Sequence, residues 1–255
     1  MSLFKYASPA AFYPLAGKLV PWFAALAAIF CIIGLYLGPF AAPTDYQQGE
    51  VYRILFIHVP AATIGMLIYV VMAIYGVMAL TFNTRLSAMM MEALAPTGAI
   101  FIALALWTGA MWGKPTWGTY WVWDARVTST LILLFLYIGY MALVNAIEDK
   151  KRADKAGALL VIVGSVNIPI IHYSVTWWNT LHQGASVTVT AAPKMASVML
   201  TPMLAMGLAC WMYAIAVSLV RVRAIILERE RGREPGQRAT WVAEALATTK
   251  QVVAP

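Results

Sequence analysis

The chain has 255 residues, of which 62% are hydrophobic and 11% are charged, and its formal net charge at pH 7 is +7. This composition excludes an ordinary soluble domain, in which about 25% of the residues are charged. A lipid bilayer is the solvent that fits such a chain, and membrane lipid is therefore the first expected partner.

Six apolar runs are long enough to cross a bilayer, which requires about 20 residues each. They lie near residues 19–40, 54–82, 93–112, 127–146, 158–178 and 196–220. We therefore expect an all-α integral membrane protein, a six-transmembrane-helix bundle that forms a single membrane domain over residues 1–255. The second run contains Pro60, which lacks a backbone donor and predicts a kink or break there. Residues 221–255 would form a charged tail.

The lysines and arginines predict how this bundle is oriented. If the N-terminus is cytoplasmic, 14 of the 18 lie in inner segments and 4 in outer segments. Positive residues are enriched in cytoplasmic loops, so both termini are predicted to be cytoplasmic. The connection between the third and fourth runs then faces outward, into the periplasm if the host is a Gram-negative bacterium. Topology thus explains the net charge, and no nucleic-acid partner is expected.

Several motifs of redox proteins and ATPases are missing from the sequence. Cys31 and Cys210 both fall inside apolar runs, where thiols usually act as small hydrophobic groups. There is no CxxC pair and no CxxCH, so the chain is not itself a c-type cytochrome. There is also no G-x-x-x-x-G-K-[ST], so any dependence on ATP must come from another chain.

The connection at residues 112–129 is the most unusual stretch, and it reads WGKPTWGTYWVWDARVTS. Its four tryptophans include Trp117, Trp121 and Trp123. An aromatic belt at the membrane interface is one explanation. Four tryptophans in one connection exceed what anchoring needs, and the alternative is a platform for a flat, apolar and partly anionic ligand. Trp117 and Trp121 would share one face if this part were helical.

The same stretch carries three charged residues with candidate roles. Lys114 and Arg126 could hold an anionic group such as a propionate. Asp124 could orient Arg126 or a tryptophan N–H.

All three histidines fall on the outward half, on the same side as residues 112–129. Neutral imidazole is a common axial ligand of haem iron, and two from different segments can bind opposite faces of one porphyrin. For His58 there is a second explanation, a hydrogen bond to the carbonyl that Pro60 frees or to a neighbouring helix. His172 lies within a helical run and fits a packing role. His182 lies in a loop, better placed to close over a docked porphyrin.

Three segments carry a resemblance to a known family: FIHVPAA at 56–62, WGTYWVWDARVTS at 117–129 and IHYSVTWWNTLHQG at 171–184. The sequence resembles the CcmC-type haem-handling (haem exporter) family of cytochrome c maturation, which has a WWD motif. The resemblance implies that His58 and His182 are the two axial ligands. It also implies a haem-holding loop whose members are Trp117, Trp121, Trp123 and Asp124, followed by Arg126. His172 matches no ligand of the family.

The resemblance further implies a protein of the bacterial inner membrane that holds haem b transiently and non-covalently at the periplasmic surface. It would present the haem to the chaperone CcmE and work with the ATPase CcmA, the membrane subunit CcmB and the small subunit CcmD. We therefore expect a haem-binding and transfer component, not an enzyme. Two alternatives are a haem-containing membrane oxidoreductase and a permease that moves haem through its own bundle. The oxidoreductase would need histidines on the inner half, where the sequence has none.

Overall fold

The computed structural model describes residues 6–184, 187, 191–231 and 241–242, and within them every regular element is a helix. Six stretches are long and apolar enough to cross a membrane, which confirms the predicted fold class. They contain seven α-helices: α1 Pro9–Leu35, α2 Leu55–Phe82, α3 Arg85–Trp117, α4 Ala125–Ala146, α5 Lys150–Gly164, α6 Asn167–Trp177 and α7 Ser197–Arg231. A π-helical turn, Tyr36–Ala41, extends α1, and a 3₁₀ turn, Glu50–Ile54, precedes α2.

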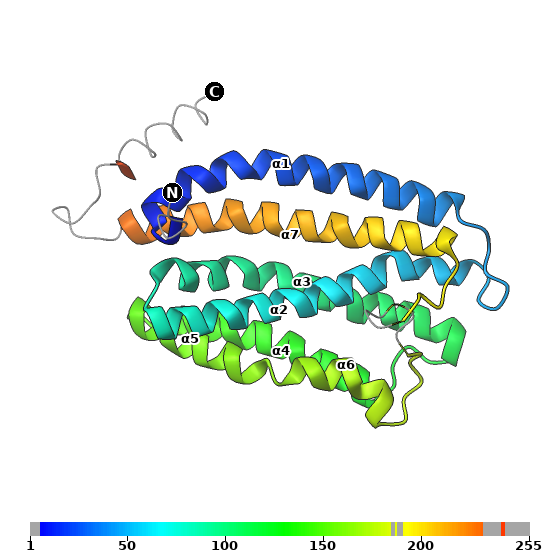
Figure 1. Ribbon diagram of the computed structural model, residues 1–255. Coiled ribbons are helices and arrows are strands. Elements are labelled where there is room, and N and C mark those ends of the chain that lie inside the picture. The colour runs from blue at the N-terminus through cyan, green and yellow to red at the C-terminus, as the bar shows by residue number, and fades with distance from the viewer. Residues whose placement is uncertain (1–5, 185–186, 188–190, 232–240, 243–255) are drawn as a thin grey trace.

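The helices lie roughly parallel in one bundle (Figure 1). α1 packs along α7, α2 packs along α3, and α4 packs against α5 and α6. α1 begins and α7 ends at the same end of the bundle, while the α3–α4 connection lies at the opposite end (Figure 1). We call the latter the loop end. The predicted tail beyond residue 231 lies almost wholly outside the described residues.

Several helices extend beyond the apolar runs of the sequence. α3 begins at Arg85 instead of near residue 93, and α7 continues to Arg231 instead of ending near residue 220. Arg229, in this extension, contacts Glu92 of α3 at 2.6 Å and Asp154 of α5 at 2.7 Å. These ion pairs join three helices at the end of the bundle opposite the loop end. Charged residues that lie outside the apolar runs of the sequence are thus still helical.

The fifth span is divided into α5 and α6, where one run was expected at residues 158–178. α5 begins early because Asp149 caps it, accepting a 2.7 Å hydrogen bond from the backbone N–H of Arg152. The helix is interrupted at Ser165 and Val166, one turn before Pro169. Pro169 has no N–H to bond the carbonyl of Ser165, so the interruption follows from its chemistry. By contrast, α2 continues through Pro60 without a break.

A tyrosine on α4 ties three helices together below the loop end. Tyr137 is fully buried, and its hydroxyl donates a 2.7 Å hydrogen bond to the carbonyl of Gly65 on α2. Its ring meets Tyr69 edge-on, with the centroids 5.0 Å apart. Gly98 on α3 leaves room for it, since a Cβ there would lie 2.2 Å from Tyr137 Cζ. This close packing fixes the relative positions of α2, α3 and α4, which carry most of the site described next.

Candidate functional site

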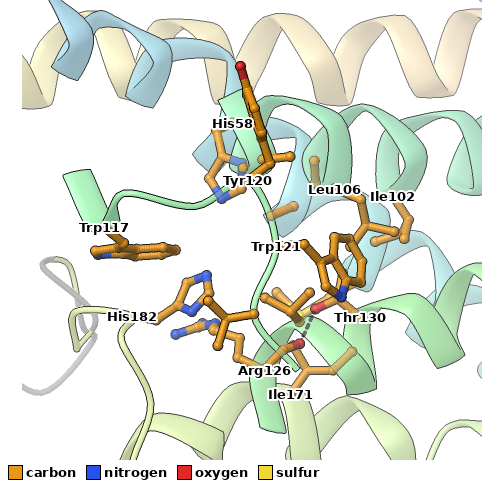
Figure 2. A pocket seen from close by; sticks show the side chains of 17 residues that line it. His58, Ile102, Leu106, Trp117, Tyr120, Trp121, Arg126, Thr130, Ile171 and His182 are labelled. Carbon is orange, nitrogen blue, oxygen red and sulfur yellow. Dashed lines mark hydrogen bonds between the residues drawn. The ribbon is translucent and has the colours of Figure 1, made fainter. Parts of the chain in front are cut away.

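A cavity opens at the loop end between α2, α3, α4, α6 and the segment after α6 (Figure 2). The empty space within it is about 650 Å³ when the open solvent at its mouth is included. Six of its lining residues are polar or aromatic: His58, Trp117, Tyr120, Trp121, Arg126 and His182. Apolar residues line the part that reaches into the bundle: Ala62, Met66, Ile102, Ala105, Leu106 and Ile171.

The tryptophan-rich connection is not helical throughout. α3 ends at Trp117, and Gly118 follows in the left-handed conformation with φ 79°, as is common where helices end. Residues 119–124 then run without regular structure to Asp124, the N-cap of α4. Trp117 and Trp121 therefore do not share a helical face. They line the same cavity because the chain turns at Gly118 and leads Trp121 back towards α4.

His58 is held against α3. Its Nδ1 lies 3.1 Å from the hydroxyl of Thr108, and its ring meets Trp112 edge-on at 5.8 Å. The hydrogen bond to a neighbouring helix, offered above as an alternative to metal ligation, is therefore present. It involves only Nδ1, and the ring still lines the cavity. One interaction does not exclude the other, because imidazole has two nitrogens.

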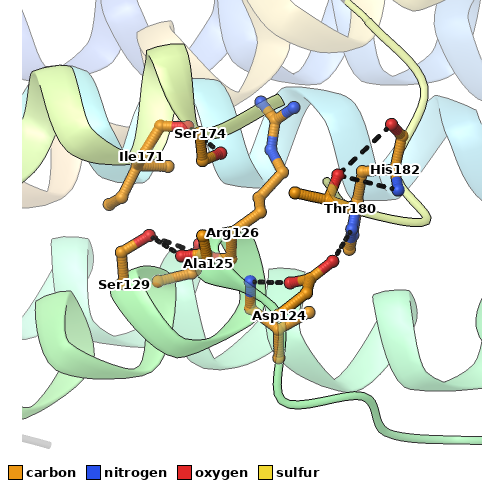
Figure 3. A network of polar contacts seen from close by, with 10 residues as sticks. Asp124, Ala125, Arg126, Ser129, Ile171, Ser174, Thr180 and His182 are labelled. Atoms are coloured by element: carbon orange, nitrogen blue, oxygen red, sulfur yellow. Dashed lines mark hydrogen bonds and ion pairs between the residues drawn. The ribbon is translucent and has the colours of Figure 1, made fainter. Parts of the chain in front are cut away.

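His182 is held by the carboxylate of Asp124 (Figure 3). Its Nδ1 lies 3.0 Å from Oδ2 of Asp124, whose side chain is 6% exposed. Oδ1 of Asp124 accepts a 2.8 Å hydrogen bond from the backbone N–H of Val127, so the carboxylate is fixed at the start of α4. The ring also packs edge-on against Trp117 at 4.7 Å.

The protonation state of His182 suits a metal ligand. Burial lowers the pKa of His182 below its usual value, and Arg126 acts in the same direction. The hydrogen bond and the charge of Asp124 raise that pKa, but burial is the larger effect. His182 is thus neutral at neutral pH. With Nδ1–H directed at Asp124, its Nε2 has a free lone pair.

Arg126 and Trp121 bring hydrogen-bond donors to the cavity that are not used inside the protein. The Arg126 guanidinium has no carboxylate within ion-pair distance among the described residues, and Figure 2 shows it beside His182. Asp124 pairs with His182 and not with Arg126 or a tryptophan. The indole N–H of Trp121 is buried without a hydrogen-bond partner in the described part of the chain. Buried donors of this kind usually have a partner, so a ligand with acceptor oxygens fits here.

Three residues considered from the sequence lie outside the cavity. Trp123 is 73% exposed and packs edge-on against Trp121 at 5.4 Å. Lys114 donates a 3.0 Å hydrogen bond to the carbonyl of Gly118 and stabilises the end of α3. His172 is exposed on α6, with its ring against Tyr173 at 4.8 Å.

The donor set fits an iron porphyrin better than a bare metal ion. Among the described residues, no group of three or more His, Cys, Asp or Glu side chains could hold an ion. Two imidazoles from α2 and from the segment after α6 instead face one cavity with aromatic walls (Figure 2). A porphyrin supplies four ligands of its own and needs only axial donors, aromatic surface and cations for its propionates.

Comparison with known proteins agrees with the sequence resemblance. The sequence model of the family described as CcmC, heme exporter protein C, matches residues 2–237. Heme exporter protein C of Haemophilus influenzae is 45% identical over 247 residues, which cover 97% of this chain and 98% of that protein. The Escherichia coli K12 protein of the same name is 42% identical over 246 residues, 96% of each chain. That of Bradyrhizobium diazoefficiens is 45% identical over 229 residues, 90% of this chain and 87% of the relative. The chain belongs to the heme exporter protein C (CcmC) family.

Proposed function

We propose that this protein binds haem b non-covalently in the cavity at the loop end and passes it to the chaperone CcmE for the biogenesis of c-type cytochromes. One observation carries the proposal. Two imidazoles on separate elements face one cavity, and each has its Nδ1 engaged by a partner inside the protein, Thr108 or Asp124. Both are therefore presented with the other nitrogen available for iron.

Different lining residues of the cavity would contact different parts of the haem. His58 and His182 would be the axial ligands, with Trp117 and Trp121 against the macrocycle. Arg126 and the indole N–H of Trp121 would bind the propionate oxygens. The apolar residues at the inner end, such as Met66 and Leu106, would contact the hydrocarbon edge. The haem iron would supply the coordination sites for the two imidazoles, whereas the protein would position the haem and release it.

The two ligands differ in how firmly the fold holds them, which suits a carrier. His58 lies on α2, a 28-residue helix within the packed bundle. His182 lies after the end of α6 in a segment without regular structure, and its main restraint is Asp124. The protein can thus open the site from the His182 side without disturbing the helices. A permanent haem site would bury both ligands in the bundle.

The location and partners follow from the charge distribution together with the family. We place the protein in the bacterial inner membrane with the cavity facing the periplasm, because the positive residues favour the opposite end. CcmA, CcmB and CcmD complete the proposed complex, in which the ATPase activity resides outside this chain. We assign the protein no catalytic step of its own.

Substitution of each histidine tests the proposal. His58→Ala and His182→Ala should each lose most bound haem, or change its visible spectrum from that of a low-spin, six-coordinate iron. His172→Ala is the matched control, because that ring is exposed and does not line the cavity. Unchanged haem content and spectrum in both of the first two variants would overturn the proposal.

Uptake of haem by sealed vesicles separates presentation from a permease. Vesicles that contain this chain alone should bind haem at their surface and accumulate none inside. Accumulation that depends on the chain would replace presentation with translocation.

A further inference from the structure

We propose that Thr108 is a positioning residue for haem ligation: its hydroxyl fixes the hydrogen of His58 on Nδ1 and leaves Nε2 free for the iron. This inference rests on the proposed haem site. Thr108 lies on α3, is 6% exposed, and places Oγ1 3.1 Å from His58 Nδ1. No motif or spacing in the sequence singles out Thr108.

The direction of the hydrogen bond follows from counting hydrogens. A threonine hydroxyl carries one hydrogen and two lone pairs. The hydroxyl of Thr108 donates to the carbonyl of Leu104 at 2.7 Å, and the carbonyl of Ala105 is more distant, at 3.3 Å. Its hydrogen is therefore engaged within α3, and towards His58 it can only accept. Nδ1 must then carry the hydrogen, and Nε2 holds the lone pair.

The packing around the ring limits the directions in which it can face. Gly109 follows Thr108, and a Cβ at that position would lie 3.0 Å from Cε1 and 3.5 Å from Nδ1 of His58. The imidazole therefore lies directly against the α3 backbone. Trp112, one turn later, covers its edge and is itself held by a 2.7 Å hydrogen bond from Nε1 to Oε1 of Gln48. The remaining side of the ring faces the cavity (Figure 2).

Thr108 and Asp124 therefore have the same role, which is to accept a hydrogen bond from Nδ1 of a histidine, but they differ in charge. Asp124 is a charged acceptor for His182, whereas Thr108 is a neutral acceptor for His58. Such outer partners of metal-binding histidines fix the tautomer and the ring orientation, and their loss typically lowers metal affinity about 10–100-fold. The carbonyl of Ala105 also interacts with the His58 ring. Loss of Thr108 should therefore weaken ligation without abolishing it.

Substitutions of Thr108 in the full-length protein test the inference. Thr108→Val keeps the shape and removes the acceptor, while Thr108→Ser keeps the hydroxyl. Purified proteins would be titrated with haemin and examined by visible and electron paramagnetic resonance spectroscopy. We expect the Val variant to lose about 10-fold or more in haem affinity and to gain a high-spin signal. The Ser variant should stay within about 3-fold of wild type, well below the 10–100-fold cost of losing such a partner.

Added imidazole separates positioning from general damage. Free imidazole can bind iron whatever the tautomer of His58, so it should restore the low-spin signal of Thr108→Val. If valine lowers the unfolding temperature of the haem-free protein, Thr108→Ala removes the same hydroxyl without bulk and should give the same spectrum. Equal affinity and spectra in wild type, Val and Ala variants would overturn the positioning role alone. Absence of haem binding by wild type would overturn the proposed function as well.

Discussion

Asp124 and His182 are 58 positions apart in the chain, yet Oδ2 of the first lies 3.0 Å from Nδ1 of the second. The aspartate belongs to the tryptophan-rich connection, and the histidine belongs to the segment after α6. Their contact joins the two parts of the site that would otherwise be independent loops. The acidic residue of the WWD motif thereby acts on an imidazole and not on a tryptophan or Arg126.

Asp124→Asn should change the electronic properties of bound haem while leaving the fold intact. Asparagine is as good an N-cap as aspartate, so α4 should keep its start. The loss of negative charge makes His182 a weaker donor, which destabilises ferric iron relative to ferrous iron. We expect a higher midpoint potential in a redox titration. A potential equal to that of wild type would show that the carboxylate does not act on the ligand.

Haem affinity should be insensitive to pH down to the usual imidazole pKa near 6.5. Burial depresses the pKa of His182, so its neutral, ligating form persists to lower pH than that of free imidazole. Protonation competes with iron only as the pH falls through that lowered value. Removal of the raising contribution of Asp124, in Asp124→Asn, should move the loss to still lower pH. Haem titrations from pH 8 to pH 5 would contradict this if affinity declined above pH 6.5.

Arg126 should contribute to haem affinity through the propionates, and Lys114 should not. A hydrogen bond to a charged group contributes about 1.5–3 kcal/mol, so Arg126→Gln should lower affinity about 10-fold or more. Lys114→Gln is the matched control, because its amino group contacts Gly118 and lies outside the cavity.

Haem dimethyl ester, whose propionates are uncharged, identifies the partner of Arg126. If Arg126 binds a propionate, Arg126→Gln should cost much less with the ester than with haem. An equal loss with both ligands would place Arg126 elsewhere in the mechanism.

Substitutions of the two tryptophans of the WxWD sequence should differ in their effect on haem affinity. Trp121 lines the cavity with an unpartnered indole N–H, so Trp121→Phe should weaken haem binding. Trp123 is 73% exposed and outside the cavity, so Trp123→Phe should leave haem affinity near wild type. Equilibrium titrations with haemin compare them directly. A larger loss in the Trp123 variant would show that the loop rearranges when haem binds.

The sequence predicts the spans well because the bilayer requires about 20 apolar residues in each. The sequence predicts helix ends less well, because capping residues and ion pairs determine where the charged helical segments begin and end. Asp149 caps the start of α5, and Arg229, beyond the apolar run of α7, pairs with Glu92 and Asp154. These contacts are made by charged side chains, so the positions of the apolar runs in the sequence do not predict them.

The residues of the site were predicted from the sequence, but their hydrogen-bond partners were not. Residue chemistry and family resemblance together predict that His58, His182, Trp117, Trp121 and Arg126 belong to one place, and all five line one cavity. The partners of the histidines could not be predicted. Thr108 is one of three threonines in α3, and only the packing of α2 on α3 brings it to His58. Asp124 was singled out, but its partner depends on a loop whose path no periodicity describes.

In the proposed site, His58 and His182 together ligate the iron of one haem. In a His172→Gln variant these two are the only histidines left in the chain. Electron–nuclear double resonance of this variant, labelled with ¹⁵N-histidine and loaded with ferric haem, reports the labelled nitrogens bound to iron. We predict coupling to two, falling to one in His58→Ala or His182→Ala. Coupling to only one labelled nitrogen, or to none, in the two-histidine protein would contradict the account.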